Sequence, residues 1–537
     1  MSSTPSTAVP PCVLHEDEHL LVVNKPAGWN THAPSPYAGE GIYDWLKHRE
    51  PRWASLAIIH RLDKETSGVL VFGKTPLANR SLTEQFAGRT VQKKYLLLAE
   101  RAPPQAAFTA KSRILRSGER YVSGAHGEAA ETKFEVQNLK SKIQSTGGGA
   151  IINCCELMAE PLTGRTHQIR VHAAANGFPI LGDTLYGGRS FQRVCLHALA
   201  LGFKHPATGE RLLFEAKSEF DRPWSQALQA SVIDCTQTNA FRLVHGASQL
   251  APGFYLDALG DYLLAQSDRP LHSAAEMPEG YLGSYCKLLT RQVRGAQTTE
   301  ACPKPFRGQA APDRFVIREN GVQFEMSFTE GYSVGLFLDQ RDNRRRFLTG
   351  HLAADFGLLT SDSKLEVLNT FAYTCGFSVC AALGGARTTS LDLSKKYLEW
   401  GRRNFALNGL DPAQHDFVYG DTFDWLRRLA KKNRTFGAVI LDPPTFSQSK
   451  ESGFFRAEKD YGKLVTAALP VLKPGGVLLA STNAAELPPE NFLDLINEAV
   501  RGAQRKIIQQ HYVPQPPDFP ISRAEPAYLK TVWLRVS

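Results

Sequence analysis

The sequence predicts a multidomain protein with three folded units: a strand-rich mixed α/β unit, a small α+β unit and a doubly wound α/β unit. A chain of 537 residues is too long for one hydrophobic core, so several domains are expected. Short apolar runs separated by Gly and Pro dominate the first 222 residues, whereas strand-like and helix-like runs alternate after residue 364. The first pattern favours a strand-dominated domain, and the second favours a mostly parallel sheet covered by helices.

The first unit is expected at residues 13–222, after a flexible N-terminus at residues 1–12. Its predicted strands are Leu20–Val23, Gly68–Phe72 and Tyr95–Ala99. Gly147 to Gly149 follow a polar stretch, which is typical of an exposed loop. Residues 223–238 are predicted to be a linker that contains a short helix.

The second unit is expected at residues 239–330, with strands at Phe254–Leu256, Asp261–Gln266 and Val322–Phe328. The third unit is expected at residues 331–537. Its predicted strands are Leu365–Thr370, Thr388–Asp392, Asp416–Tyr419, Ala438–Asp442, Val477–Ser481, Lys506–His511 and Leu529–Val536, with helices at Phe377–Leu383 and Ser394–Leu407. This alternation with short connections predicts an open, Rossmann-like, doubly wound sheet.

Composition excludes several classes of protein. Hydrophobic residues make up 42% and charged residues 21% of the chain, which is typical of globular proteins. The nine cysteines are scattered and form no C-x-x-C pair, so we expect reduced cytoplasmic thiols and no metal site. No apolar run is long enough to cross a bilayer, and no secretory signal is evident. The net charge of +9 favours a polyanionic partner such as RNA.

The first candidate motif is His60 to Gly68, which reads His-Arg-Leu-Asp-Lys-Glu-Thr-Ser-Gly and precedes an apolar strand. It places Asp63 beside Arg61 and Lys64. A neighbouring cation keeps such a carboxylate ionised, as a nucleophile or a base requires. A surface turn with a local ion pair is the ordinary alternative for so short a motif.

A second block starts at Thr163 and reads Thr-Gly-Arg-Thr-His-Gln-Ile-Arg-Val-His. It gathers Arg165, His167, Arg170 and His172 within eight positions. If the block is a strand, Arg170 and His172 share one face and could contact phosphates or a base. A solvated strand is the alternative.

Together the two blocks resemble the RluA-type RNA pseudouridine synthases, with similarity from residue 13 to about 220 that includes Asn24 to Gly28, Lys93 to Tyr95 and Pro179 to Gly187. The resemblance implies an α+β fold with a mixed, mainly antiparallel sheet and no cofactor. It implies that Asp63 is the catalytic aspartate, Tyr95 stacks on the target base, Arg170 pairs with the active-site carboxylate and Arg61 helps to extrude the nucleotide. Arg165, His167 and His172 are expected to contact RNA.

Uridine isomerisation breaks the C1′–N1 bond and rejoins the ribose to C5, so the base must leave the stack. Whether Asp63 attacks the ribose, attacks the ring or removes a proton stays open at the level of sequence.

In the third unit, Asp392, Asp421 and Asp442 follow three consecutive predicted strands. The turn after the first strand, Asn369 to Phe377, lies where α/β sheets bind cofactors. Asp392 is placed to bind a ribose, and Asp421 is placed to reach an adenine. Each aspartate could instead cap the helix that follows it.

These motifs are similar to those of class I S-adenosylmethionine-dependent methyltransferases. More narrowly, residues 239 to 537 resemble bacterial large-subunit rRNA methyltransferases that make 5-methylcytidine or 7-methylguanosine, on Phe241 to Gly246, Gly335 to Arg341, the turn at 369–376 and Leu441 to Ser447. The resemblance implies S-adenosylmethionine as the cofactor, bound by Asn369, Phe371, Tyr373, Gly376, Asp392, Asp421, Asp442 and Pro443, with Asp339 and Arg341 at the cofactor entrance. It also implies that the 442–446 loop holds the acceptor base, with Asp442 catalytic and Phe446 against the RNA.

The chemistry of the two reactions helps to decide which atom accepts the methyl group. Methylation at C5 of cytosine needs a thiolate that adds to C6, and no cysteine follows Cys380. A guanine nitrogen needs only positioning beside the sulfonium methyl group, so we favour it. The segment Asp339 to Arg344, in contrast, looks closer to the cytidine branch.

Other basic and unusual positions complete the expectations. Arg344, Arg345 and Arg346 lie beside the predicted site and are expected to contact RNA phosphates. Cys375 stands where relatives usually have glycine, so the turn must tolerate a side chain.

The favoured hypothesis is a monomeric bifunctional enzyme that modifies two nearby nucleotides of one structured RNA, with rRNA preferred over tRNA. The alternative is that one domain is catalytic and the other only binds RNA.

Overall fold

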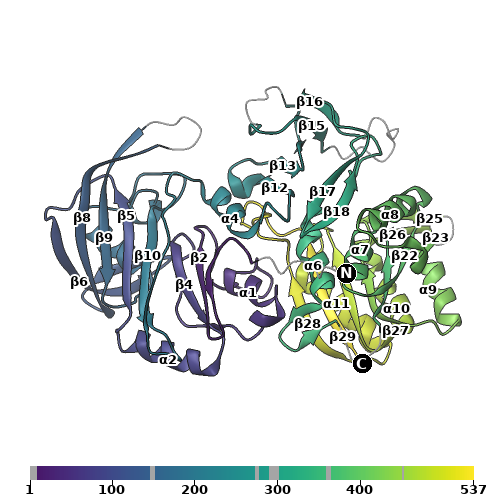
Figure 1. Cartoon of the computed structure of the whole chain (residues 1–537), viewed down its shortest axis with the longest axis horizontal. Coiled ribbons are helices and arrows are strands. Elements are labelled where there is room, and N and C mark those ends of the chain that lie inside the picture. The colour runs from purple at the N-terminus through teal and green to yellow at the C-terminus, as the bar shows by residue number, and fades with distance from the viewer. Residues whose placement is uncertain (1–8, 145–150, 272–276, 290–301, 359–363, 450–452) are drawn as a thin grey trace.

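The computed structural model describes residues 9–144, 151–271, 277–289, 302–358, 364–449 and 453–537. In Figure 1 the N-terminal unit, in purple and blue, lies at one end, and the C-terminal unit, in green and yellow, lies at the other. The predicted loop at Gly147 to Gly149 and residues 1–8 of the predicted N-terminal segment lie outside the described residues. None of the described helices is both long and apolar enough to span a membrane.

An eleven-stranded sheet forms the N-terminal unit, in the order β1-β2-β4-β10-β5-β9-β8-β6-β7 with β3 beside β4 and β11 beside β10. The strands are β1 (Val13–Glu16), β2 (Leu20–Lys25), β3 (Ala57–Ile58), β4 (Ser67–Gly73), β5 (Gln92–Ala99), β6 (Ala107–Ser117), β7 (Arg120–Gly124), β8 (Glu128–Gln144), β9 (Ile151–Pro161), β10 (Leu196–Lys204) and β11 (Arg211–Glu215). Among the described strands of this sheet, β4 and β10 pair in parallel and the other pairs are antiparallel. The predicted mixed, mainly antiparallel fold is confirmed.

Both faces of this sheet are covered where β2 crosses it. Leu21 and Val23 pack in one core with α1 (Ile42–Lys47), while Leu20 and Val22 pack in another with α2 (Pro76–Ala87). Successive residues of a strand point to opposite faces, so a continuous apolar run is what burial on both sides requires.

The predicted strand that would carry Arg170 and His172 is wrong, because residues Gln168–Ala175 form helix α3. On a helix, residues two positions apart point in different directions. The helix is buried on every side from Gln168 to Ala173, so its sequence shows no polar face with a helical period.

The segment at 223–238 contains the predicted helix, α4 (Trp224–Val232), but it is packed rather than extended. Leu228 and Val232 join the core of the N-terminal unit. The amide of Gln229 donates hydrogen bonds to the carbonyls of Arg242, at 2.7 Å, and Leu243, at 2.8 Å. The helix therefore connects the first and second units through specific contacts.

The central unit is a five-stranded sheet in sequence order, followed by a hairpin. The strands are β12 (Ala240–His245), β13 (Phe254–Leu259), β14 (Tyr262–Ser267), β15 (Gly283–Leu288) and β16 (Lys304–Gly308), and the hairpin is β17 (Phe315–Glu319) and β18 (Val322–Met326). Phe324 and Met326 of the hairpin share a core with Phe347 and Phe377 of the C-terminal unit. The hydrophobic core is thus continuous across the boundary expected at residue 330.

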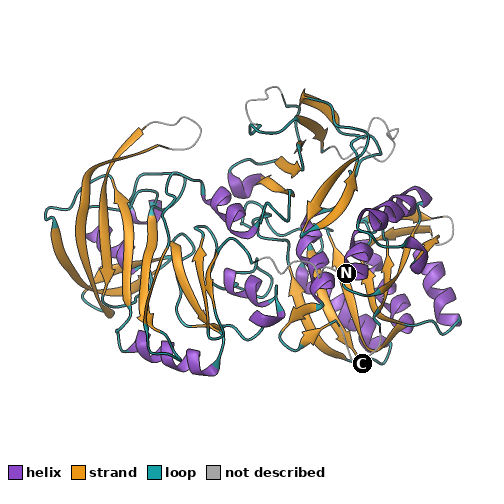
Figure 2. Cartoon of the chain, viewed as in Figure 1, coloured by secondary structure: helices purple, strands orange, loops and turns teal. Residues whose placement is uncertain are grey.

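The C-terminal unit is a seven-stranded sheet in the order β23-β22-β21-β24-β27-β29-β28, with β21 to β24 and β27 parallel. Its strands are β21 (Glu366–Thr370), β22 (Arg387–Asp392), β23 (Asp416–Tyr419), β24 (Phe436–Leu441), β27 (Leu472–Thr482), β28 (Ile507–Val513) and β29 (Lys530–Val536). Its helices are α6 (Arg341–Thr349), α7 (Gly376–Leu383), α8 (Lys395–Leu407), α9 (Thr422–Lys431), α10 (Ala457–Ala468) and α11 (Pro489–Gly502), with a hairpin of β25 (Phe446–Ser449) and β26 (Gly453–Arg456). Figure 2 shows these helices around the sheet.

Alternate residues of the central strands enter different cores. Val367 and Ile440 pack with α6, α7 and α8, whereas Leu368 and Val439 pack with α10 and α11. The two-sided cover confirms the predicted doubly wound sheet.

Candidate functional site

Asp63 lies on the loop that precedes β4, and its neighbours on both sides are held by buried side chains. The Thr31 hydroxyl donates to the Leu62 carbonyl at 2.9 Å. The Lys25 ammonium donates to the carbonyls of Pro26 (2.9 Å), Trp29 (2.7 Å) and Lys64 (3.3 Å). Lys25 is fully buried, and burial lowers its pKa to about 7. The backbone that carries Asp63 is therefore rigidly placed.

Two groups of the second sequence block flank the Asp63 carboxylate. Its Oδ2 lies 3.9 Å from Nη1 of Arg170 and 4.0 Å from Nε2 of His167. Burial raises the pKa of Asp63, and the positive charge of Arg170 opposes that rise. Burial lowers the pKa of His167, whose Nδ1 lies 2.8 Å from the Tyr186 hydroxyl.

Arg170 is oriented by Asp183, a residue to which the sequence alone assigned no role. Nε of Arg170 donates to Oδ2 of Asp183 at 2.7 Å, and Nη2 donates to Oδ1 at 2.8 Å. Both side chains are buried, and Nη1 also donates to Glu65 at 3.3 Å. Asp183 lies within the Pro179 to Gly187 motif, but its pairing with Arg170 is not evident from the sequence.

These residues open into a cleft of about 1240 Å³. The sequence-predicted residues that line it are Arg61, Asp63, Tyr95, Arg165, His167 and Arg170. Arg61 is exposed, and burial raises the pKa of Tyr95. The volume admits an extruded nucleotide.

His172 does not belong to this cleft, which corrects the expectation that it contacts RNA. It is buried, with Nε2 3.0 Å from the Ser112 hydroxyl and Nδ1 2.9 Å from the Thr132 hydroxyl. It holds α3 against the sheet.

In the C-terminal unit, the turn after β21 has an unusual backbone. Phe371, Tyr373 and Cys375 have φ angles of 55°, 49° and 64°. Such left-handed conformations are costly for residues with side chains and gather at functional sites. Asp392 stabilises the turn by accepting 2.8 Å hydrogen bonds from the backbone N–H groups of Tyr373 and Ser394. The turn lies at the carboxyl ends of parallel strands, where α/β sheets bind ligands.

The other predicted cofactor residues differ in their placement. Asp421 is the N-cap of α9, where its Oδ1 accepts from Asp424 N–H at 3.0 Å. Asn369 is buried and its amide donates to the Ser378 hydroxyl at 2.9 Å. Gly376 begins α7, and a Cβ there would lie 2.9 Å from Leu336.

Asp442 follows β24 in a compact polar cluster. Its Oδ2 accepts from the Gln340 amide at 3.2 Å, and the same amide donates to the Ser481 hydroxyl at 2.8 Å. Burial, together with the charge of nearby Asp339, raises the pKa of Asp442 to about 7. Burial also raises the pKa of Asp339, which accepts from Tyr528 at 3.0 Å.

Arg341 and Arg344 form structural ion pairs, which corrects their expected positions at the cofactor entrance and on the RNA. Arg341 donates to both oxygens of Asp518, at 2.9 and 2.5 Å. Arg344 donates to both oxygens of Glu319, at 2.7 and 2.6 Å. All four side chains are buried.

The next two arginines reach the N-terminal unit and are likewise buried, so their expected RNA contacts are also corrected. Arg345 pairs with Glu50, and Arg346 lies 3.9 Å from Glu40. Charged side chains are buried when they are paired, and here the partners come from another unit.

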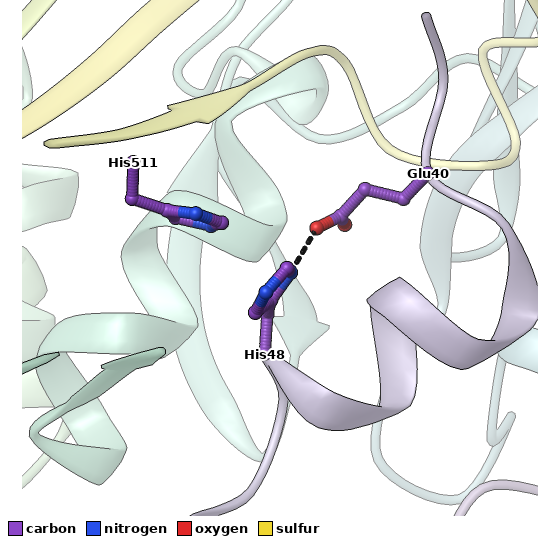
Figure 3. Close-up of side chains that lie close together, drawn as sticks. All are labelled: Glu40, His48 and His511. Atoms are coloured by element: carbon purple, nitrogen blue, oxygen red, sulfur yellow. Dashed lines mark hydrogen bonds and ion pairs between the residues drawn. The ribbon is translucent and has the colours of Figure 1, made fainter. Parts of the chain in front are cut away.

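Glu40, His48 and His511 meet at this contact between the units (Figure 3). Each offers one atom that could bind a metal ion, and these atoms lie within 4.8 Å of one another. His48 Nδ1 lies 2.6 Å from the Glu40 carboxylate, and the rings of His48 and His511 are 4.2 Å apart. Arg346 already places a cation beside Glu40, so we interpret the cluster as an interdomain contact.

Comparison with known proteins identifies two families in the chain. The RNA pseudouridylate synthase family matches residues 19–175, and the S-adenosylmethionine-dependent methyltransferase family matches residues 283–535. A putative ribosomal RNA large subunit methyltransferase of Bacillus subtilis is 32% identical over 57% of this chain and 77% of its own length. The ribosomal large subunit pseudouridine synthase C of Yersinia pestis is 39% identical over 39% of this chain and 66% of its own length.

A solved structure is also similar. The putative methyltransferase SMU.776, complexed with SAH, is 30% identical over 58% of this chain and 79% of its own, with a TM-score of 0.49.

Proposed function

Since the chain belongs to the large-subunit rRNA methyltransferases through its C-terminal part and to the RNA pseudouridylate synthases through its N-terminal part, we propose that it modifies rRNA at two nucleotides. Asp63 catalyses the isomerisation of a uridine to pseudouridine. A guanine nitrogen receives a methyl group beside Asp442.

The placement of Asp63 supports its catalytic role over that of Glu65, which also lies near Arg170 and lines the cleft. Its side chain is 24% exposed, against 41% for Glu65. Its flanking residues are held by Thr31 and Lys25, so the carboxylate faces the cleft from a fixed backbone. Preorganised groups of this kind stabilise a transition state without reorganisation.

The reaction needs no cofactor, because its atoms balance within the nucleotide. The C1′–N1 bond breaks, a C1′–C5 bond forms, and the proton lost from C5 is matched by one gained at N1. Asp63 supplies the carboxylate that engages the sugar or the detached base. Arg170, held by Asp183, offsets its negative charge.

In the described part of the C-terminal unit, both cysteines are buried, which supports a nitrogen acceptor. Ser481 lies in the Asp442 cluster, and the described cysteines of the C-terminal unit, Cys375 and Cys380, are buried in the core. Burial raises the pKa of both thiols, so neither forms the thiolate that C5 methylation requires.

The residues around the strained turn suit S-adenosylmethionine. The bound cofactor supplies an electrophilic methyl group. Asp392 and the turn from Phe371 to Cys375 would hold it at the carboxyl ends of β21 and β22. Asp442 would accept a hydrogen bond from the amino or imino group of the guanine and so orient the base.

Nucleoside mass spectrometry of rRNA tests both assignments. A strain that lacks the protein is complemented with wild type, Asp63→Asn, Asp442→Asn or the control Glu65→Gln. We expect Asp63→Asn to lose one pseudouridine and keep the methylation, and Asp442→Asn to lose a methylguanosine and keep the pseudouridine. Glu65→Gln should retain both.

Three results would contradict the proposal. Full restoration by Asp442→Asn would make the C-terminal unit an RNA-binding module, and full restoration by Asp63→Asn would do the same for the N-terminal unit. Loss of a 5-methylcytidine in the Asp442→Asn strain would show that the acceptor is C5 of cytosine and not a guanine nitrogen.

A further inference from the structure

A second cavity, of about 410 Å³, lies between the units and is distinct from the Asp63 cleft. Residues of the N-terminal unit, helix α4, the central unit and the 515–522 segment of the C-terminal unit all line it. The lining includes Trp29, Lys64, Trp224, Gln515, Phe519 and Ile521. We call it the interunit cavity.

Gln515 is a buried amide that lacks a partner for its donor group. Its side chain is 4% exposed, and its Oε1 accepts from Leu529 N–H at 3.4 Å. Its Nε2 has no hydrogen-bond partner among the described residues. An unpaired buried donor is costly, so a ligand that offers an acceptor would satisfy it.

The walls of the interunit cavity suit a flat, apolar ring. Trp29, Trp224, Phe519 and Ile521 provide the apolar surface. Trp29 is fixed by a 2.7 Å hydrogen bond from its Nε1 to the Glu40 carbonyl. Trp224 covers Gly28 so closely that a Cβ there would lie 2.5 Å from its ring. Proteins bind unstacked bases of single-stranded RNA on aromatic surfaces of this kind.

On one side, the interunit cavity lies next to the Asp63 cleft. Asn30, Pro34, Lys64 and Glu65 line both the cavity and the Asp63 cleft. Lys64 is exposed, so its ammonium group is free to approach a phosphate that joins two nucleotides.

On the other side, the chain that lines the cavity leads to the methyltransferase site. The connection from β28 to β29 includes Gln515 and Tyr528, and the Tyr528 hydroxyl donates to Asp339 at 3.0 Å. Asp339 is the charged neighbour of Asp442. One segment of the chain therefore both lines the interunit cavity and contacts the candidate methyltransferase site.

We propose that the interunit cavity is a subsite for one nucleobase of the substrate RNA, next to the uridine that enters the Asp63 cleft. The base stacks on the aromatic wall, and a carbonyl oxygen of the base accepts from Gln515 Nε2. The subsite rests on the proposed function, since it reads the same RNA strand. It positions that strand between the two sites.

An RNA-binding assay tests the proposed subsite separately from catalysis. The probe is an unmodified transcript of large-subunit rRNA, bound to protein that carries Asp63→Asn so that no turnover occurs. In this background, Ile521→Trp fills the cavity and Gln515→Leu removes the amide at similar volume. The control Ile508→Trp adds the same ring at a 56% exposed position of β28.

We expect Ile521→Trp to weaken binding about tenfold and Gln515→Leu by severalfold, since one stacked base is lost or misplaced. Ile508→Trp should bind like the parent, and melting temperatures confirm that each variant is folded. With a 4-thiouridine transcript, ultraviolet cross-links should map to peptides that contain Trp224 or Phe519 and disappear with Ile521→Trp.

The outcomes separate the two proposals. Failure of the Asp63→Asn protein to bind the transcript at all would overturn the rRNA function. Normal binding that neither cavity variant weakens, with cross-links confined to the Asp63 cleft, would overturn the subsite alone.

Discussion

Arg170 and Asp183 form a buried, two-pronged ion pair, with Nε 2.7 Å from Oδ2 and Nη2 2.8 Å from Oδ1. The pair fixes the guanidinium whose third nitrogen lies 3.9 Å from Asp63. The surroundings of Asp63, the proposed catalytic residue, thus depend on Asp183, which is paired with Arg170.

Asp183→Asn should lower both stability and the rate of pseudouridine formation. Removing one partner of a buried ion pair costs about 3–5 kcal/mol, because the other charge is left unpaired. Thermal unfolding and a single-turnover assay measure the two effects. As a control, Glu100→Gln breaks the 2.8 Å Arg189–Glu100 pair, whose side chains are 52% and 37% exposed, and should cost less than about 1 kcal/mol. Equal losses in the two variants would refute this role of Asp183.

Asp442 should make stability depend on pH near neutrality. Its folded pKa of about 7 exceeds the value of about 3.9 for an unfolded aspartate. The folded protein therefore binds this proton more tightly, and the associated stability is present below pH about 4 and is lost as the pH rises to about 7. Asp442→Asn should raise the melting temperature at about pH 8 and do so much less at about pH 5. The exposed control Asp416→Asn should show no such difference.

The fit between Cys375 and Gly401 gives a double-mutant test of the cofactor turn. A Cβ on Gly401 would lie 2.3 Å from Cys375 Sγ, so Gly401→Ala should destabilise the protein by about 1–3 kcal/mol and weaken S-adenosylmethionine binding. Cys375→Gly removes that sulfur, and glycine readily adopts the φ of 64° found at position 375. The double variant should therefore recover both stability and S-adenosylmethionine binding. Calorimetry and cofactor titration measure the recovery.

Gly502→Ala is the matched control for this test, because nothing lies within 4 Å of its added Cβ. A double variant as impaired as Gly401→Ala would show that the sulfur is not the cause.

Acid should loosen the contact between the N-terminal and C-terminal units. Burial holds the pKa of His511 well below its usual value, and His48, His351 and Arg346 add to that shift. A depressed histidine pKa means that stability is present above pH about 6.5 and is lost as the pH falls. Small-angle scattering from about pH 8 to pH 5 should show the units separating, and His511→Phe should reduce the effect.

The exposed His126→Phe serves as the control and should behave like wild type. A radius of gyration that is independent of pH would rule out this dependence.

The local sequence predicted those elements whose pattern of apolar residues matches the way they are buried. The run Leu20 to Val23 indicated a strand because both faces of β2 are covered. The block with Arg170 and His172 was misread as a strand because α3 is buried all round and shows no helical period.

Charge patterns do not predict burial where the ion-pair partners are distant in sequence. Arg344 pairs with Glu319, 25 positions away, and Arg345 pairs with Glu50, 295 positions away. No local pattern contains such a pairing, so a run of arginines reads as a basic surface.

The sequence by itself determined both families and the doubly wound sheet, and it named Asp63 and Asp442 as candidate catalytic residues, because short-range motifs and periodicity encode them. Only the tertiary structure decided which charges are buried and which line a site. It also decided that Asp183 orients Arg170, and that Gln515, which lines a cavity between the units, has an amide donor with no partner among the described residues. Arg170 and Asp183 lie on separate elements 13 positions apart and meet only when the N-terminal unit folds. The cavity is lined by segments that are hundreds of residues apart in the sequence, so it forms only when the units pack together.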